Sequence, residues 1–399
     1  MTMAQSARST PPIWVLAFAV SGANVGISLL SPAIPDLRAE LMATADQAQL
    51  VLSGFLVMLG LGQLGAGTLS DRIGRRPVMM GGAVLFTVSG LAALLSTTVE
   101  MLIVARLVQG LGAAACMAMG RVIISDSYER AEAGRQLSTI TMFQAVVPLL
   151  GFAFGGMLVD LVGWRGTVSL MVATAMITLV SSYFLVAESR DDQGPVLPAG
   201  QILSTYGRLL VTQKFISNAS APALMTGVFF AMGGFMPYHF QRLGTSAFEF
   251  GLFFSATTLG YIFGNNLNRT FGPRHGIDRA AFAGSIVSIL SMTVLTGAAL
   301  SGLAREVVIS ICLFGYGTGN GFVVANGLIG AIRAAGRNSG AATGLCGALQ
   351  MAGSAAIGSF IVALGGDVNF ELAMGICWVM VAVGVVGAWK ALDKGPSAQ

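Results

Sequence analysis

The stretch Gly67-Thr68-Leu69-Ser70-Asp71-Arg72-Ile73-Gly74-Arg75-Arg76-Pro77-Val78 is a short charged segment between two long apolar runs. Residues 50–69 before it and residues 78–97 after it are each about as long as a helix that crosses a lipid bilayer. A connection this short makes the two helices antiparallel neighbours. Gly67 and Gly74 allow the close backbone approach and the unusual dihedral angles that a tight turn needs. The stretch therefore predicts a helical hairpin in a membrane, with a cluster of charges at the membrane surface.

The composition of the whole chain indicates a membrane protein. Hydrophobic residues make up 54% of the 399 residues and charged residues only 10%, which excludes an ordinary soluble domain. The 53 glycines suit helices that pack closely in a bilayer. Four cysteines lie singly in apolar runs, which argues against a disulfide framework or a metal site, and no metal or other cofactor is expected.

Apolar runs of spanning length recur from one end of the chain to the other. They predict an all-α membrane protein with twelve spans, over residues 13–35, 48–69, 77–97, 99–120, 135–159, 165–187, 215–238, 249–270, 277–299, 305–328, 339–363 and 371–391.

Lys and Arg residues are unevenly distributed between the two predicted sides of the membrane. With a cytoplasmic N-terminus, the cytoplasmic loops and tails hold most of them, with Arg121 counted in such a loop, and the opposite side holds only Arg38, Arg165, Arg242 and Arg305. The positive-inside rule therefore places both termini in the cytoplasm. The basic loops are explained by this topology, so no nucleic-acid partner is expected. We also expect no cleavable signal peptide, because a short polar stretch leads directly into the first span.

The longest hydrophilic stretch lies near the middle of the chain and divides the spans into two sets of six. A weak internal repeat supports this division, because Leu267, Gly272 and Arg274 follow Leu69, Gly74 and Arg76 at a spacing of 198 residues. We predict an N-terminal six-helix bundle over residues 1–187, a cytoplasmic linker over 188–214 and a C-terminal bundle over 215–399.

The charged segment at residues 67–76 resembles the signature loop between helices 2 and 3 of the major facilitator superfamily, which has the form G-x-L-x-D-R-x-G-R-R. The resemblance implies secondary transport by alternating access between two pseudo-symmetric bundles. It also implies a gate in which Asp71 faces a helix of the other half and Arg75 bridges to an acid, here Asp126. The residues assigned to this gate are Gly67, Asp71, Arg72, Gly74, Arg75, Arg76 and Asp126. The alternative is a set of solvated ion pairs worth less than about 1 kcal/mol.

Arg106 lies within the fourth predicted span, where a guanidinium is costly unless it meets water or partners. Its surroundings, R-x-x-Q-G-x-G, resemble the helix 4 motif of proton-coupled members of the superfamily, which implies a coupling role. The guanidinium would act on a neighbouring group or on water, because it stays charged and does not itself carry the proton. The alternative is a structural arginine that bonds backbone carbonyls across the N-terminal bundle.

The fifth predicted span contains Pro148, Gly151, Gly155 and Gly156, which resemble the helix 5 motif of superfamily antiporters, although Phe152 replaces a second proline. We assign these four residues to gating, because small residues allow close helix contact and proline removes a backbone hydrogen bond. The alternative is glycine packing without a gating role.

The first predicted span ends in a P-x-x-P pattern at Pro32 and Pro35, which resembles the Bcr/CflA group of drug/proton antiporters. Members of that group often carry an aspartate where this chain has Ser28, and no acid lies deep in any predicted span. Asp36 is the nearest substitute as a coupling carboxylate. Coupling through Asp71 or Asp126, indirect coupling and no coupling remain open.

A substrate is expected between the halves near the middle of the membrane. The candidate binding residues are polar or aromatic side chains within the spans: Asn24, Gln144, Phe229, Phe230, Tyr261, Asn265, Tyr316, Asn320, Asn326 and Gln350. Uncharged amides need partners in a bilayer, which favours Asn24, Gln144, Asn320 and Gln350 among them.

These patterns predict a monomeric bacterial inner-membrane transporter that exports hydrophobic or amphiphilic small molecules in exchange for protons. Neutral or zwitterionic substrates are favoured, because no intramembrane acid offers a counter-charge to a cation. The alternatives are a dedicated transporter of one metabolite, sugar, siderophore or lipid, and a transport-dead membrane receptor. An enzyme is not expected, because the chain contains no nucleophile–base constellation and only two histidines.

Overall fold

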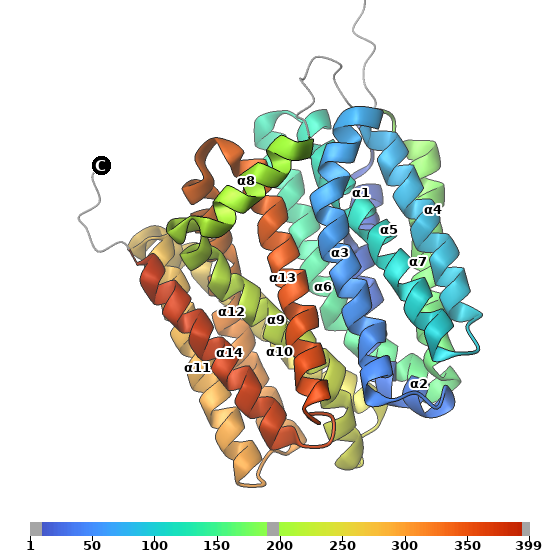
Figure 1. Cartoon of the computed structure of the whole chain (residues 1–399), viewed down its shortest axis with the longest axis vertical. Coiled ribbons are helices and arrows are strands. Elements are labelled where there is room, and N and C mark those ends of the chain that lie inside the picture. The colour runs from blue at the N-terminus through green and yellow to red at the C-terminus, as the bar shows by residue number, and fades with distance from the viewer. Residues whose placement is uncertain (1–9, 190–198, 393–399) are drawn as a thin grey trace, which may run out of the picture.

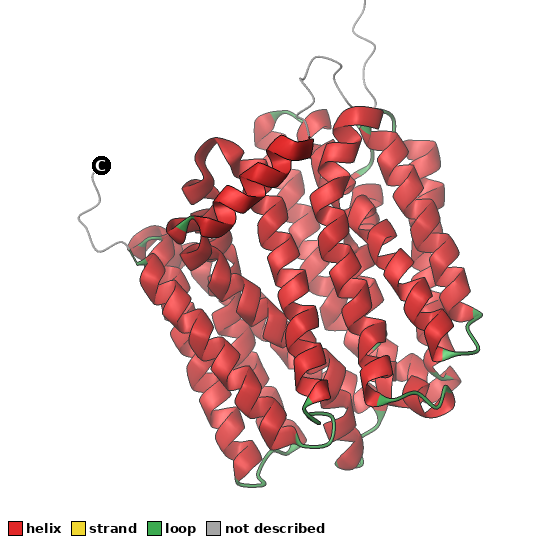
Figure 2. Cartoon of the chain, in the orientation of Figure 1, coloured by secondary structure: helices red, strands yellow, loops and turns green. Residues whose placement is uncertain are grey.

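The computed structural model describes residues 10–189 and 199–392, and every regular element in these ranges is a helix (Figure 2). The elements are α1 (Ile13–Ser28), η1 (Ser31–Ala33), α2 (Ile34–Glu40), α3 (Ala45–Ile73), α4 (Arg75–Leu94), α5 (Val99–Ser127), α6 (Arg130–Val162), α7 (Trp164–Leu185), α8 (Ala199–Val211), α9 (Gln213–Arg242), α10 (Ala247–His275), α11 (Ile277–Leu300), α12 (Glu306–Ala335), η2 (Gly336–Asn338), α13 (Ser339–Ala363) and α14 (Phe370–Ala391).

The helices form two six-helix bundles that stand side by side (Figure 1). The N bundle contains α1 to α7, in which α5 packs on α3 and α4, and the C bundle contains α9 to α14, in which α12 packs on α10 and α11. The bundles meet along two helix pairs, α6 with α10 and α3 with α13. We call the end of the molecule that carries α8 the α8 end, and the opposite end, with η1 and α2, the α2 end (Figure 1).

Eleven helices of the described chain are long and apolar enough to cross a membrane. The helix that occupies the remaining predicted span, α10, is 29 residues long, but its second half contains Asn265, Asn266, Asn268 and Arg269, which lower its mean hydropathy. Apolar side chains such as Leu161 and Phe184 are more than 70% exposed in the isolated chain, as expected for helices whose outer faces contact lipid. The described residues thus form a multi-pass membrane protein in which these eleven helices, together with α10, occupy the twelve predicted spans.

The first predicted span is not one continuous helix. We expected a helix over residues 13–35, but α1 ends at Ser28, and η1 and α2 follow it as separate elements. Pro32 and Pro35 each lie in the first turn of one of these elements. Because proline has no N–H, it is tolerated in the first turn of a helix, whereas inside a helix it removes a backbone hydrogen bond and kinks or interrupts the helix.

Several other helices are longer than the apolar runs that predicted them. The fourth span was expected to end at residue 120, but α5 continues to Ser127, so the expectation that Arg121 belongs to a loop is wrong. The added turns carry polar residues that the hydropathy pattern had assigned to the connection.

The predicted linker contains a helix that was not anticipated. Part of the linker, residues 190–198, lies outside the described residues, and residues 199–211 form α8, which packs on α9 and α13. Tyr206 of α8 donates from its hydroxyl to the Leu64 carbonyl of the N bundle at 3.5 Å. Burial raises the pKa of this hydroxyl above its ordinary value. The linker helix thus contacts both bundles at the α8 end.

Candidate functional site

The turn between α3 and α4 is built around one glycine and one arginine. Gly74 has a φ of 102°, a left-handed conformation that favours glycine, and α4 begins at the next residue. The Arg75 guanidinium donates to Asp71 at 2.6 Å, to Ser70 Oγ at 2.6 Å and to Asp126 at 3.1 Å. The pairing of Arg75 with Asp126 is the one that the motif implied, and it joins α3, α4 and α5 at the α8 end.

Asp71 belongs to the N bundle alone in this conformation. Its side chain is 49% exposed, and the hydrogen bond that we identify for it in the described chain goes to Arg75, with none to α13. Gly67 makes no close approach in this conformation, because a Cβ at this position would have no neighbour within 4 Å. Arg76 donates to the Tyr183 carbonyl near the end of α7 at 2.9 Å.

Glu188, which the motif did not indicate, caps the start of α4. Its carboxylate accepts hydrogen bonds from the backbone N–H groups of Arg75 at 2.9 Å and Arg76 at 3.1 Å. The first N–H groups of a helix have no partner within the helix, and a carboxylate there is also favoured by the helix dipole. Glu188 lies just beyond α7, so it fixes the charged turn to the end of the N bundle.

Replacing Glu188 with alanine is expected to lower the free energy of unfolding by about 1 kcal/mol, the usual effect of losing a helix N-cap. The matched control is Glu188→Gln, which keeps one oxygen that can accept from the same amides. Thermal unfolding of the purified variants in one detergent measures the effect. An alanine variant that unfolds at the wild-type midpoint would contradict this role.

A second aspartate caps a helix across the bundle interface at the α2 end. Asp160, in the last turn of α6, accepts from the N–H groups of Ala247 at 3.2 Å and Phe248 at 2.9 Å, the first two residues of α10. The sequence around it, Leu158-Val159-Asp160-Leu161-Val162-Gly163-Trp164-Arg165, repeats the pattern L-x-D-x-x-G-x-R of residues 69–76. Gly163, like Gly74, has a positive φ and joins two helices directly.

Further contacts join the bundles near the α2 end. Ser31 Oγ donates to the Gly233 carbonyl at 2.5 Å, and Arg38 forms an ion pair with Asp367 at 3.0 Å. Ser255 of α10 donates to the Leu149 carbonyl of α6 at 2.8 Å. These bonds hold the two bundles together at the α2 end. Asp36 lies close by in the first turn of α2, with an exposed side chain.

The glycines of α6 lie where this helix meets its neighbours most closely. A Cβ on Gly151 would overlap the Ser28 side chain, a Cβ on Gly155 the Leu29 carbonyl and a Cβ on Gly156 the Ala247 carbonyl of the C bundle. Pro148 lies inside the same helix. In the other direction, a Cβ on Gly251 of α10 would overlap the Phe152 carbonyl. The backbones of α6 and α10 thus interlock without intervening side chains.

Phe152 anchors an aromatic cluster between the bundles. It is 1% exposed, and its ring lies edge-on to Phe254 of α10 at 4.7 Å and to Phe229 of α9 at 6.2 Å between centroids. Phe229 is stacked on Phe254 and contacts Phe230. The departure from the antiporter motif at residue 152 therefore places an aromatic ring at the interface.

Arg106 is fully buried, and all three of its guanidinium nitrogens have acceptors. Nε donates to the Val51 carbonyl at 3.2 Å, Nη2 to the Gly26 carbonyl at 2.8 Å and Nη1 to Gln109 Oε1 at 2.6 Å. The guanidinium carbon also lies 4.1 Å from the centroid of the Phe55 ring. Arg106 thus joins α1, α3 and α5, the geometry of the structural alternative considered for it.

Asn24 and Gln144, two of the favoured binding residues, lie together with Arg121. The Asn24 amide donates to the Gln144 carbonyl at 2.9 Å, and Arg121 Nη2 donates to Gln144 Oε1 at 3.0 Å. The cluster joins α1, α5 and α6 in the N bundle. The apolar run of the fourth predicted span ends just before Arg121, which is why the hydropathy pattern predicted a loop at this residue.

The candidate residues of the C bundle fall into two groups. Tyr316 and Asn326 are buried and bonded within the bundle, Tyr316 to the Met225 carbonyl and Asn326 to Asn268, so both serve packing in this conformation. In the second group, Tyr261 and Gln350 are half-buried. Asn320 is buried, and within the described chain its side-chain oxygen Oδ1 has no hydrogen-bond partner. Asn265 donates to the Tyr261 carbonyl.

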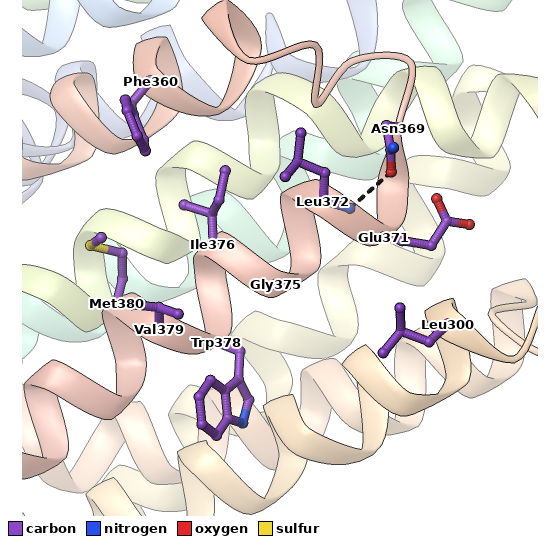
Figure 3. A pocket seen from close by; sticks show the side chains of 10 residues that line it. All are labelled: Leu300, Phe360, Asn369, Glu371, Leu372, Gly375, Ile376, Trp378, Val379 and Met380. Atoms are coloured by element: carbon purple, nitrogen blue, oxygen red, sulfur yellow. Dashed lines mark hydrogen bonds between the residues drawn. The ribbon is translucent and has the colours of Figure 1, made fainter.

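A groove of about 700 Å³ lies elsewhere, between α11, α13 and α14 (Figure 3). Its lining is mostly apolar and includes Phe360, Trp378 and Val379, with Asn369 and Glu371 at one end (Figure 3), and none of the candidate binding residues lines it. These apolar side chains are more than a third exposed on the outer side of the C bundle, where lipid chains would cover them. The described residues contain no group of three or more His, Cys, Asp or Glu side chains that could hold a metal ion.

Comparison with known families identifies the fold. The family model of the Major Facilitator Superfamily matches residues 16–267, more than half of the chain. The chain belongs to the major facilitator superfamily. The crystal structure of a D-xylose–proton symporter superposes with a TM-score of 0.74 over 96% of this chain and 98% of its own, at 15% identity. A bacterial homologue of the lysosomal transporter Spinster, in an inward-facing conformation, gives a TM-score of 0.70.

Curated members of the superfamily with similar sequences carry names from drug resistance. The Chloramphenicol resistance protein of Pseudomonas aeruginosa is 30% identical over 60% of this chain and 57% of its own length. Multidrug resistance protein D of Escherichia coli is 30% identical over 52% of each chain, and the Bicyclomycin resistance protein homolog of Haemophilus influenzae is 22% identical over 89% of this chain and 90% of its own. This chain thus spans little more than half of the first two relatives and nearly all of the third.

Proposed function

We propose that this superfamily member is a monomeric transporter, and not an enzyme, that exports hydrophobic or amphiphilic small molecules across a bacterial inner membrane in exchange for protons. Three relatives whose names refer to chloramphenicol, bicyclomycin and multidrug resistance support the substrate class. Residues 1–187 and 215–399 would act as two units joined by the linker at 188–214.

The distribution of positive charge supports a cytoplasmic α8 end. Arg72, Arg75, Arg76 and Arg333 lie in helix turns at this end, as does Lys390 in the last turn of α14. Lys and Arg accumulate on the cytoplasmic side of spanning helices. Both termini are then cytoplasmic, and the α2 end faces the periplasm.

The observation that carries the mechanism is the set of contacts that join the bundles at the α2 end. In this conformation Asp160, Ser31 and Arg38 bond across the interface there, while Asp71 is bonded within its own bundle. We interpret this as the state closed toward the periplasm. In the opposite state these contacts would separate and Asp71 would reach the start of α13, where the helix dipole favours a carboxylate.

Asp160 and Asp71 are then equivalent latches at the two ends. Each lies near the end of a helix, in the same L-x-D-x-x-G-x-R pattern, and each precedes a glycine with positive φ. Members of the superfamily contain inverted repeats of three helices within each bundle, which would relate α3 to α6. Protons that arrive from the periplasm would meet the exposed carboxylates of Asp36 and Asp160 first, and Arg106 would contribute by fixing α1, α3 and α5 relative to one another.

Replacing Asp160 with alanine is expected to shift the protein several-fold toward the state that is open at the α2 end. Because Asp160 is exposed, its two bonds to α10 are worth about 1 kcal/mol, as for other N-caps. The control is Asp160→Asn, which retains one accepting oxygen and should have a smaller effect. Accessibility of a cysteine introduced at Ser255 to a thiol reagent measures the shift, and equal reactivity in all three proteins would argue against the latch.

Accumulation of radiolabelled chloramphenicol in cells that lack their own drug exporters tests the function. Cells that produce this protein should accumulate several-fold less drug than cells with an empty vector, and a protonophore should abolish the difference. If accumulation stays at the control level for a panel of antibiotics and dyes, with the protein present in the membrane, export of drugs is wrong. Transport of a single metabolite would then indicate the dedicated-transporter alternative.

A further inference from the structure

Two arginines, Arg106 and Arg121, lie inside the spanning part of α5. They differ in how many of their guanidinium nitrogens donate to an acceptor of the protein. Arg106 donates from every guanidinium nitrogen to an acceptor of the N bundle. Arg121, which lies six residues before the end of α5 at Ser127, donates from Nη2 to Gln144 Oε1. In the described chain Nε and Nη1 have no acceptor, and neither of these two atoms is completely buried.

No carboxylate among the described residues forms an ion pair with Arg121. The ion pairs identified in the described chain join Arg38, Arg75, Arg135 and Arg165 to acids, and Arg121 is absent from them. The nearest acid along α5 is Asp126, which is bonded to Arg75. A guanidinium in a spanning helix without a counter-charge is costly, and such residues mark sites that bind or move a ligand.

The neighbours of Arg121 hold it in one orientation. The side-chain oxygen of Gln144 in α6 accepts from Arg121 Nη2, and its Nε2 donates to the Val20 carbonyl at 3.5 Å. The backbone carbonyl of Gln144 accepts a hydrogen bond from the Asn24 side chain. Three helices therefore fix the position of the guanidinium while two of its nitrogens stay free for a ligand. The planar guanidinium donates two parallel hydrogen bonds, a geometry that fits a carboxylate.

We propose that Arg121 binds an anionic group of the transported molecule, such as a carboxylate, and that Gln144 and Asn24 orient it. The inference rests on the proposed function, because it takes the bound molecule to be the transported one. It narrows the substrate class to anionic or zwitterionic amphiphiles. Cations are disfavoured at this site because they would meet an uncompensated positive charge. The pair of amides was expected to contact substrate directly, and here their role is to position the arginine.

Binding of three probes with one ring system tests the charge preference. The probes are 1-naphthoate, 1-naphthamide and 1-naphthylmethylammonium, titrated calorimetrically into the purified full chain in a neutral detergent. A charge-assisted pair of hydrogen bonds predicts that naphthoate binds about tenfold or more tightly than the amide, with the cation weakest. Arg121→Gln should remove this preference. The control Arg135→Gln, which removes a charge from a residue that is 75% exposed, should keep it.

A second variant keeps the test decisive if Arg121→Gln does not fold. Gln144→Glu places a carboxylate beside Arg121 and should abolish the preference for naphthoate while the arginine remains. Equal binding of the three probes to the wild type, or a preference that survives both substitutions, would overturn the proposal. If phosphatidylglycerol, but not phosphatidylcholine, displaces naphthoate, the occupant is a lipid phosphate and the assignment to substrate is wrong.

The outcome separates this inference from the proposed function. Binding is measured without transport, so a charge preference that depends on Arg121 in a protein that moves no drug would refute drug export alone. Export of chloramphenicol, unchanged in Arg121→Gln and with no preference for naphthoate, would refute the anion site alone.

Discussion

Replacing Gly156 with alanine is expected to prevent closure of the α2 end and to reduce transport at least tenfold. The added methyl group would overlap the Ala247 carbonyl of α10, which is backbone and does not move aside as a flexible side chain would. Overpacking of a tight contact costs about 1–3 kcal/mol, which changes the equilibrium between closed and open states about fivefold to more than a hundredfold.

The matched control for this variant is Gly134→Ala in the same helix, where a Cβ would have no neighbour within 4 Å. Spin labels on cysteines introduced at Met42 and Leu303, both exposed near the α2 end, report the distance between bundles, since the four native cysteines are buried. The Gly156→Ala distance distribution should move to longer distances, and that of Gly134→Ala should match the wild type. A wild-type distribution in both variants would refute the interlocked contact between α6 and α10.

Replacing Arg106 with alanine is expected to destabilise the protein more than any other substitution considered. The change removes a charged donor from three buried acceptors, the carbonyls of Gly26 and Val51 and the Gln109 side chain. A hydrogen bond to a charged group contributes about 1.5–3 kcal/mol, so the loss of three such bonds should lower the free energy of unfolding by at least about 3 kcal/mol. Arg106→Lys should recover only part, because an ammonium does not reproduce the planar set of donors.

The midpoint of thermal unfolding in a fixed detergent measures this loss, with Arg135→Ala at an exposed site as the control for removal of one charge. Surface ion pairs contribute less than about 1 kcal/mol, so the control should unfold near the wild-type midpoint. An Arg106→Ala protein with wild-type stability but no proton-coupled transport would support a coupling role and contradict the structural one.

The fold could be predicted from the sequence because a membrane-spanning helix is identified by the length of its apolar run. Apolar length predicted the helices, and the segment at residues 67–76 predicted the α3–α4 hairpin and the Arg75–Asp126 pair. The helix break at Ser28 and the extension of α5 to Ser127 were missed, because hydropathy does not report where a helix ends once polar residues follow an apolar run. Both errors concern boundaries, which depend on capping and on proline.

The candidate site was less predictable, because its contacts join residues far apart in the chain. Asp160 bonds to α10 and Glu188 to α4 only after the helices pack, and no local pattern names their partners. The repeat of L-x-D-x-x-G-x-R at residues 158–165 was visible in the sequence and would have indicated Asp160. For Arg121 the decisive property is the absence of a carboxylate around it, which only the folded chain displays.

Uptake of substrate into proteoliposomes tests the central claim, that this protein exchanges a small amphiphilic molecule for protons. The purified protein is reconstituted, an acidic lumen is imposed and radiolabelled chloramphenicol is added outside, with naphthoate and a cationic dye assayed in parallel. The account predicts uptake above equilibrium that a protonophore abolishes and that Gly156→Ala greatly reduces, while Gly134→Ala retains it. Uptake that is independent of the pH gradient for every compound, or that is unchanged in Gly156→Ala, would contradict this account.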